Sequence, residues 1–134
     1  MNALVIDDSM TMRHLVKRML EDSFPGCHVS EASEGRAAIR ALTQQRIDLI
    51  ITDLEMPGMD GRRFLSTLQG NPLLRKKSVI VLSSAITDEL RSLMADAENV
   101  ALLSKPADAR AIKEAVEKTL SMNPSFEASK EVTN

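Results

Sequence analysis

Five polar side chains that could do chemistry together stand directly after short apolar runs of the sequence: Asp7, Asp8, Asp53, Ser83 and Lys105. A short apolar run followed by polar or turn residues predicts a buried strand that ends there. The carboxyl ends of parallel strands meet at one edge of a sheet, where open α/β sheets bind their ligands. The sequence therefore predicts that three carboxylates, a hydroxyl and an amine share one site.

The expected site carries a surplus of negative charge. Two carboxylates about 4 Å apart repel by roughly 4 kcal/mol at an effective dielectric constant near 20. Lys105 offsets one charge, and a hard divalent cation with oxygen ligands, Mg2+ above all, would offset the rest. A carboxylate beside Mg2+, an amine and a hydroxyl is equipped to accept a phosphoryl group, which makes Asp53 a candidate nucleophile.

Each of these residues alone has a plainer interpretation. Asp53 can cap a turn, Asp7 and Asp8 can cap a helix, Ser83 can end a strand, and Lys105 can lie in an exposed turn. The five residues favour a functional site only because they follow successive strands and have complementary chemistry.

Five apolar runs alternate along the chain with amphipathic segments. This alternation predicts a doubly wound α/β domain, with one parallel sheet, right-handed crossovers and five helices covering both faces. The expected strands are residues 3–6, 27–32, 47–53, 78–84 and 100–103, and the last helix is expected from Asp108 to Met122. Residues 1–122 form the predicted domain, and the polar residues 123–134 form a predicted mobile tail.

Local signals predict how two of the helices begin and which face of the first is buried. Ser9 and Ser33 are expected N-caps, because their hydroxyls can accept a hydrogen bond from the first helical turn. In the first helix Arg13 is expected on the solvent face. The buried face predicted from helical spacing consists of Met12, Leu15, Val16, Met19 and Leu20.

The composition limits the class of protein. The chain has 134 residues, 43% of them hydrophobic, which suits one domain. Its formal net charge of −2 disfavours generic binding to nucleic acid or anionic membranes. Cys27 is the only cysteine, and no apolar run approaches the roughly 20 residues of a membrane span. We expect a cytoplasmic protein with neither a nucleic acid nor a membrane partner.

Four stretches together resemble the receiver domain of two-component response regulators, over about residues 3–122. They are Val5 to Ser9, Asp53 to Gly61, Leu82 to Ala85, and Lys105-Pro106. The resemblance implies a flavodoxin-like sheet with strand order 2-1-3-4-5, organised as in stand-alone chemotaxis regulators of the CheY type.

The resemblance also implies roles for the candidate residues. Asp53 would be the phosphoacceptor, charged by a sensor histidine kinase or a phosphotransfer protein. Asp7, Asp8 and Asp53, with the backbone carbonyl of Glu55, would bind Mg2+. Ser83 and Lys105 would contact the phosphoryl group. The domain would catalyse only its own phosphorylation and dephosphorylation, and so would not be an enzyme acting on other substrates.

Three further positions near the predicted site are Ser83, Glu55 and Leu102. Ser83 is preferred to Ser84 as the phosphoryl contact, because its distance of 30 residues from Asp53 matches the spacing in the family it resembles and strand alternation should turn Ser84 away. Glu55 is expected to tune the lifetime of the phosphorylated form through its charge. Leu102 stands where proteins of this family often carry a Tyr or Phe that turns inward on activation, and it has neither the aromatic ring nor the hydroxyl of that switch.

Phosphorylation is expected to signal to a downstream protein through the surface of the fourth helix, fifth strand and fifth helix. Three alternatives stay open from the sequence. The chain could be a receiver cut from a larger response regulator, an aspartate-dependent phosphohydrolase, or a binding module that is never phosphorylated.

Overall fold

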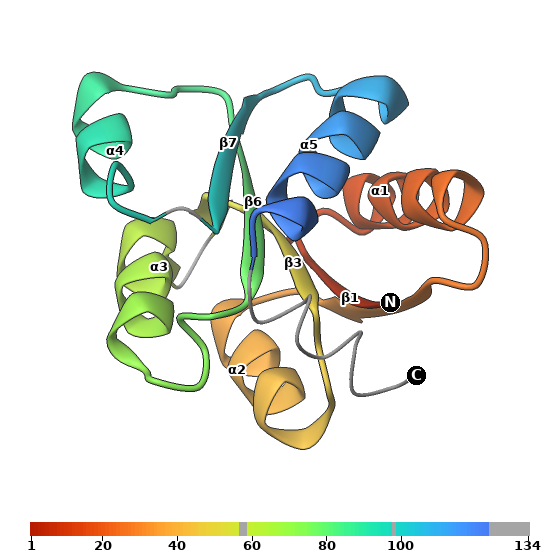
Figure 1. Cartoon of the computed structure of the whole chain (residues 1–134), viewed down its shortest axis with the longest axis horizontal. Helices are drawn as coiled ribbons and strands as arrows, with labels where there is room; N and C mark the ends of the chain where they lie inside the picture. The colour runs from red at the N-terminus through yellow and green to blue at the C-terminus, as the bar shows by residue number, and fades with distance from the viewer. Residues whose placement is uncertain (57–58, 98, 124–134) are drawn as a thin grey trace.

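The computed structural model describes residues 1–56, 59–97 and 99–123, with the backbone alone at residues 56, 59 and 60. Helices and strands alternate through most of this range (Figure 1). In chain order the elements are β1 (Asn2–Ile6), α1 (Met10–Ser23), β2 (His28–Ala32), α2 (Gly35–Gln44), β3 (Leu49–Asp53), β4 (Glu55–Met56), β5 (Met59–Asp60), α3 (Gly61–Gly70), β6 (Ser78–Ser83), α4 (Asp88–Leu93), β7 (Val100–Ser104) and α5 (Ala109–Ser121).

The main sheet has five parallel strands in the order β2-β1-β3-β6-β7. Numbered among themselves, these strands run 2-1-3-4-5, so the predicted doubly wound fold is confirmed. Helices α1 and α5 cover one face, and α2, α3 and α4 cover the other (Figure 1).

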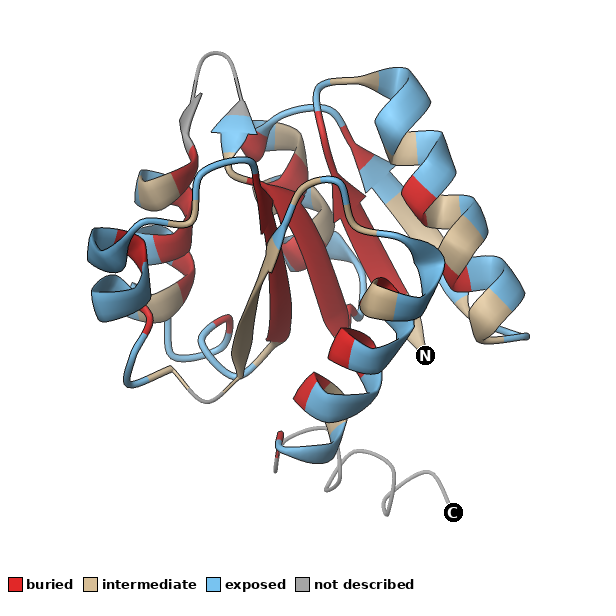
Figure 2. Ribbon diagram, turned by 90° about the horizontal axis from the view of Figure 1, so that it is seen from above, coloured by how far each residue is buried: buried red, intermediate tan, exposed pale blue. Residues whose placement is uncertain are grey.

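Two apolar cores lie on the two faces of the sheet. In β1, Leu4 and Ile6 face the core shared with α2, α3 and α4, whereas Ala3 and Val5 face the core shared with α1 and α5. The strands β1, β3 and β6 are almost wholly buried (Figure 2), as expected for strands covered on both faces. The edge strand β7 is only half-buried over most of its length.

Of the two predicted N-caps, one is confirmed and the other is wrong. Ser9 caps α1 by accepting a hydrogen bond from the backbone N–H of Met12 at 3.3 Å. Asp108 caps α5 in the same way, accepting from Ala111 N at 2.8 Å. The predicted cap at Ser33 is wrong: Glu34 is the N-cap of α2, and its side chain makes no capping bond.

The predicted buried face of α1 is too wide. Val16 and Leu20 are buried, but Met12 and Leu15 are exposed by 36% and 45%. Arg13, expected in solvent, turns inward and its side chain is only 15% exposed. The helix is therefore rotated so that a narrower apolar stripe meets the sheet and Arg13 reaches the end of β1.

The structure differs from the prediction in two further places, one just after Asp53 and one at the end of the domain. The structure adds a two-stranded antiparallel sheet, β4 with β5, directly after Asp53, where the sequence predicted only a turn. At the far end of the domain Asn123 is buried and donates hydrogen bonds to Lys76 O at 2.8 Å and Ser78 Oγ at 2.7 Å. Asn123 thus belongs to the domain, one residue beyond the predicted boundary, and the rest of the predicted tail lies outside the described residues.

Within the part of the chain that the structure describes, we find no helix of sufficient length and apolarity for a membrane span.

Candidate functional site

The predicted site residues meet at the carboxyl edge of the sheet. The pairing register places the ends of the strands level: Ile6 lies beside Thr52, Asp53 beside Leu82, and Ser83 beside Ser104. Each functional side chain therefore stands at or just after the end of its strand. Asp7, Asp53 and Ser83 are all buried at this edge.

Three carboxylates form one acidic cluster. Asp7, Asp8 and Asp53 each offer an oxygen, and these oxygens lie within 4.8 Å of one another. Asp7 and Asp53 are buried, whereas Asp8 is exposed, so the cluster opens to solvent on one side. Oxygen ligands of this kind suit a hard divalent cation such as Mg2+.

The environment of Asp7 disfavours its charge. Burial raises the pKa of Asp7, and the charges of Asp53 and Asp8 raise it further, although the backbone N–H of Ser9 and the charge of Lys105 act in the opposite direction. The N–H of Ser9 donates to Asp7 Oδ1 at 2.9 Å. A cation bound between these carboxylates would relieve the cost of keeping them ionised.

Lys105 is the positive group of the site. Its Nζ donates to Asp53 Oδ1 at 2.7 Å, and the same oxygen accepts the backbone N–H of Glu55 at 3.1 Å. Burial by itself lowers the pKa of Lys105, but the hydrogen bond and charge of Asp53, with the charges of Asp7 and Glu55, raise it overall. The amine thus stays protonated beside the expected acceptor oxygen.

The carboxylate of Glu55 binds the hydroxyls of Ser83 and Ser84, a contact that the sequence did not indicate. Its Oε1 accepts hydrogen bonds from Ser83 Oγ at 3.1 Å, Ser84 Oγ at 2.7 Å and Ser84 N at 3.2 Å. The hydrogen bond from the Ser84 hydroxyl is the main cause that lowers the pKa of Glu55. The expectation that Ser84 turns away from Ser83 is wrong, because β6 ends at Ser83 and strand alternation stops there.

Arg13 supports the site, and the sequence interpretation missed it. Its Nη1 donates to the backbone carbonyl of Asp7 at 2.8 Å, and its Nε donates to Glu31 Oε1 at 3.1 Å. This pair joins α1 to the ends of β1 and β2. Helical periodicity placed Arg13 on the solvent face, and the only sequence signal for its role is its position one turn after Ser9.

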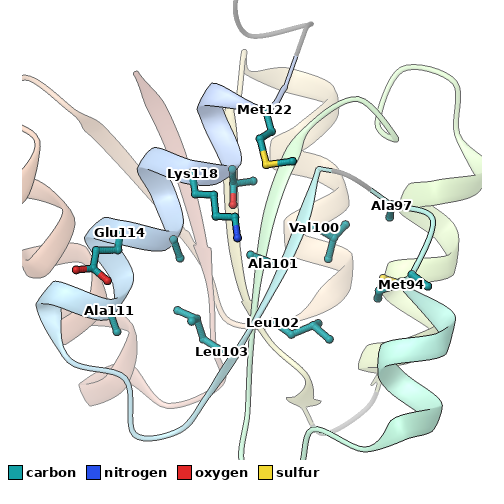
Figure 3. A pocket seen from close by; sticks show the side chains of 13 residues that line it. Met94, Ala97, Val100, Ala101, Leu102, Leu103, Ala111, Glu114, Lys118 and Met122 are labelled. Carbon is teal, nitrogen blue, oxygen red and sulfur yellow. The ribbon is translucent and has the colours of Figure 1, made fainter.

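A separate apolar groove of about 560 Å³ runs along β7 between the end of α4 and α5 (Figure 3). Leu102 and Leu103 lie in its wall, and Glu114 and Lys118 project from α5 at its side. Leu102 is half-buried and packs against the core on the α4 face of the sheet. The groove lies on the surface predicted to carry the signal.

Comparisons with known proteins agree with this geometry. The model of the response regulator receiver domain matches residues 3–117. The chain is 30% identical over 118 residues to the chemotaxis protein CheY of Pseudomonas aeruginosa, a match that covers 88% of this chain and 94% of that protein. It is 26% identical over 131 residues to the cyclic di-GMP phosphodiesterase response regulator RpfG of Xanthomonas campestris, covering 98% of this chain but only 35% of RpfG.

Among solved structures, the chemotaxis response regulator CheY4 of Vibrio cholerae superposes with a TM-score of 0.77 at 24% identity, covering 88% of this chain and 97% of that one. This likeness shows the same fold. Together with the match to the family model, these results confirm the resemblance inferred from the motifs, and the chain belongs to the family of response regulator receiver domains.

Proposed function

We propose that this receiver domain accepts a phosphoryl group on Asp53 from a sensor histidine kinase or a phosphotransfer protein. The observation that carries the proposal is the 2.7 Å hydrogen bond from Lys105 Nζ to Asp53 Oδ1, inside a cluster that also holds Asp7 and Asp8. A carboxylate at the carboxyl edge of the sheet, with an amine hydrogen-bonded to it, has the arrangement that phosphoryl transfer needs.

In the proposed transfer a carboxylate oxygen of Asp53 attacks the phosphorus of a phosphohistidine. The bond from phosphorus to oxygen forms while the bond from phosphorus to the imidazole nitrogen breaks, and the nitrogen keeps the electron pair. In this proposal Lys105 and the buried hydroxyl of Ser83 bind the phosphoryl oxygens and stabilise their charge, which the bond from Lys105 to Asp53 and the burial of Ser83 support.

The acidic cluster fits Mg2+ by its donor set. Asp7, Asp8 and Asp53 would hold the ion, together with the backbone carbonyl of Glu55. When bound, Mg2+ would neutralise charge on the carboxylates and on the transferring group. In this proposal Asp7 contributes a buried ligand whose own ionisation is disfavoured, so that cation binding and the ionisation of Asp7 are coupled.

The proposed signal passes from the site to the surface formed by α4, β7 and α5. Lys105 follows β7 directly, and its backbone N–H donates to Ser83 O at 2.9 Å, so movement at the phosphoryl group is passed to both strand ends. Leu102 on β7 connects the core beneath α4 with the apolar groove. A downstream protein would bind there and respond to the state of Asp53.

This function differs from that of a phosphohydrolase in its stoichiometry. We expect acetyl phosphate with Mg2+ to add one phosphoryl group to each chain, followed by slow loss, with negligible hydrolysis of p-nitrophenyl phosphate. Intact-mass spectrometry and a colorimetric phosphate assay measure the two quantities. Asp53→Asn is the control that should take up nothing, and steady turnover of the ester would instead support the hydrolase.

A further inference from the structure

The carboxylate of Glu55 occupies the hydrogen-bond donors that surround the proposed phosphoryl site. Oε1 accepts from the Ser83 hydroxyl at 3.1 Å and from the Ser84 hydroxyl at 2.7 Å, and it also accepts the backbone N–H of Ser84 at 3.2 Å. Oε2 lies 3.9 Å from Lys105 Nζ. An anion thus already binds both serines, with the lysine close by.

We propose that Glu55 is an internal placeholder for the phosphoryl group: it binds these donors in the resting protein and is displaced when Asp53 is phosphorylated. The inference rests on the proposed function of Asp53. Phosphorylation then becomes an exchange of one anion for another beside Ser83 and Lys105, whereas Ser84 only holds Glu55 in its resting place.

The burial of Ser83 explains why an acceptor beside it is useful before phosphorylation. Ser83 is 1% exposed, and a buried hydroxyl that lacks a partner costs stability. In the resting protein Ser83 Oγ is shared between Glu55 and the backbone of Ala85, with Ala85 N donating to it at 3.1 Å. Glu55 and the Ala85 carbonyl therefore both offer the Ser83 hydroxyl an acceptor while no phosphoryl group is present.

The exposure of Glu55 explains how the exchange can occur. Its side chain is 47% exposed, so it can leave the serines for solvent without opening either core. Glu55 begins β4 and Ser84 follows β6 directly, so its departure also releases a link between the chain after Asp53 and the loop that leads to α4. The release would loosen the loop on the side of the proposed output surface.

Two effects of Glu55 on an incoming phosphoryl group must be separated. A carboxylate repels an anion through its charge alone, whether or not it binds the serines. Competition for donors, by contrast, depends on the hydrogen bonds that hold Glu55 in place. Ser84→Ala tests this point, because it removes the shortest of these bonds and leaves the charge of Glu55 unchanged.

The experiment titrates beryllofluoride, a phosphoryl mimic, into the protein with Mg2+. The chain has no Trp or Tyr, so backbone amide NMR shifts or calorimetry replace intrinsic fluorescence. We expect Glu55→Ala to bind beryllofluoride about fivefold more tightly and Ser84→Ala about twofold more tightly, a scale set by hydrogen bonds that are partly exposed. The double variant should match Glu55→Ala, because both changes remove the same competition.

The matched control is Glu117→Gln, which removes one exposed negative charge from α5, away from the site. It should bind beryllofluoride as the wild type does. Glu55→Ala binding no more tightly than wild type overturns the placeholder. Tighter binding by Glu55→Ala together with unchanged binding by Ser84→Ala also overturns it, and leaves charge repulsion as the explanation. Weaker binding by Ser84→Ala overturns it as well, because Ser84 would then bind the phosphoryl group instead of only holding Glu55.

The same experiment distinguishes a failure of the proposed function of Asp53 from a failure of the Glu55 placeholder. If the wild type takes up neither beryllofluoride nor a phosphoryl group, the function proposed for Asp53 fails and the exchange fails with it. If the wild type takes up both, but the Glu55 and Ser84 variants bind beryllofluoride no more tightly than the wild type, the function stands and the placeholder alone fails.

Discussion

The sheet edge that holds Asp53 and the groove along β7 differ in how tightly their side chains are held. At the edge, Asp7, Asp53 and Ser83 are buried and each makes a hydrogen bond through its side chain. The groove is lined mainly by Ala, Leu, Val and Met side chains, and the residues of β7 that line it are only half-buried. The fold therefore holds the polar side chains of the edge more tightly than the side chains that line the groove.

This comparison also shows where charge limits stability. At the edge the raised pKa of Asp7 shows that its charge is disfavoured, whereas the raised pKa of Lys105 and the lowered pKa of Glu55 show that theirs are favoured. The groove contains few such conflicts, because it is largely apolar. Substitutions at the edge should therefore affect phosphorylation most, and those at the groove should affect it least.

The largest expected effect is at Lys105. Lys105→Ala should slow phosphorylation by acetyl phosphate about a hundredfold, because it removes the cation that binds Asp53 and, as proposed, the phosphoryl oxygens. Rates from intact-mass time courses measure this effect. Lys113→Ala, at an exposed position of α5, is the control, and a Lys105→Ala rate within threefold of wild type would contradict the proposed role.

Gly61 tests the packing of the chain just after Asp53. A Cβ at residue 61 would overlap the backbone carbonyl of Leu54, so Gly61→Ala must move one of the two segments. We expect a loss of about 1–3 kcal/mol in the free energy of unfolding, together with slower phosphorylation. Urea denaturation checks the first quantity.

Gly70→Ala is the matched control for Gly61→Ala. Nothing lies within 4 Å of a Cβ at residue 70, so this change should leave stability unchanged or slightly improved. Equal stabilities of the two variants would show that the close approach to Leu54 is unimportant.

Asp7→Asn should stabilise the domain in the absence of divalent cations, by about 1 kcal/mol, because it removes one of three crowded negative charges. The sign follows from the pKa. Since the folded-state pKa of Asp7 is raised, ionised Asp7 destabilises the fold above that pKa, and the penalty disappears as the pH falls through it.

The gain from Asp7→Asn should therefore be largest near pH 7 and vanish under acidic conditions. Thermal unfolding across pH measures this difference. Added Mg2+ should raise the unfolding temperature of the wild type much more than that of Asp7→Asn, since binding to the folded state stabilises it. Asp96→Asn, an exposed control, should behave as the wild type does, and a gain at Asp7→Asn that does not depend on pH would refute the charge explanation.

The smallest expected effect on phosphorylation is at the groove. Leu102→Ala removes a half-buried side chain and should cost about 1–2 kcal/mol of stability, with a phosphorylation rate within about twofold of wild type. The two measurements are denaturation and the mass time course. A tenfold change in rate would mean that the edge and the groove are coupled more strongly than their separation in the structure suggests.

Much of the fold and part of the site could be predicted because both depend on local signals. The apolar runs that stop at Asp7, Asp53 and Ser83 indicated the strand ends, and alternation with amphipathic segments then placed those ends on one edge. The grouping of Asp53 with Lys105 followed from this topology alone.

The rest depends on contacts between segments that sequence spacing does not reveal. Glu55 contacts Ser84 only because the chain after β3 and the chain after β6 converge, although Ser84 stands 29 positions after Glu55 in the sequence. Arg13 turns inward because Asp7 and Glu31 offer acceptors to it, and this sets the rotation of α1. Periodicity shows that a helix has an apolar face but does not show how much of that face the sheet covers.

The most direct test of the central claim is to identify the residue that takes up the phosphoryl group. After incubation with acetyl phosphate and Mg2+, borohydride reduces an aspartyl phosphate to homoserine, and tandem mass spectrometry of peptides locates the change. We predict homoserine at Asp53 in the wild type. Modification at Asp7 or Asp8 instead, or no modification at all, would contradict the account.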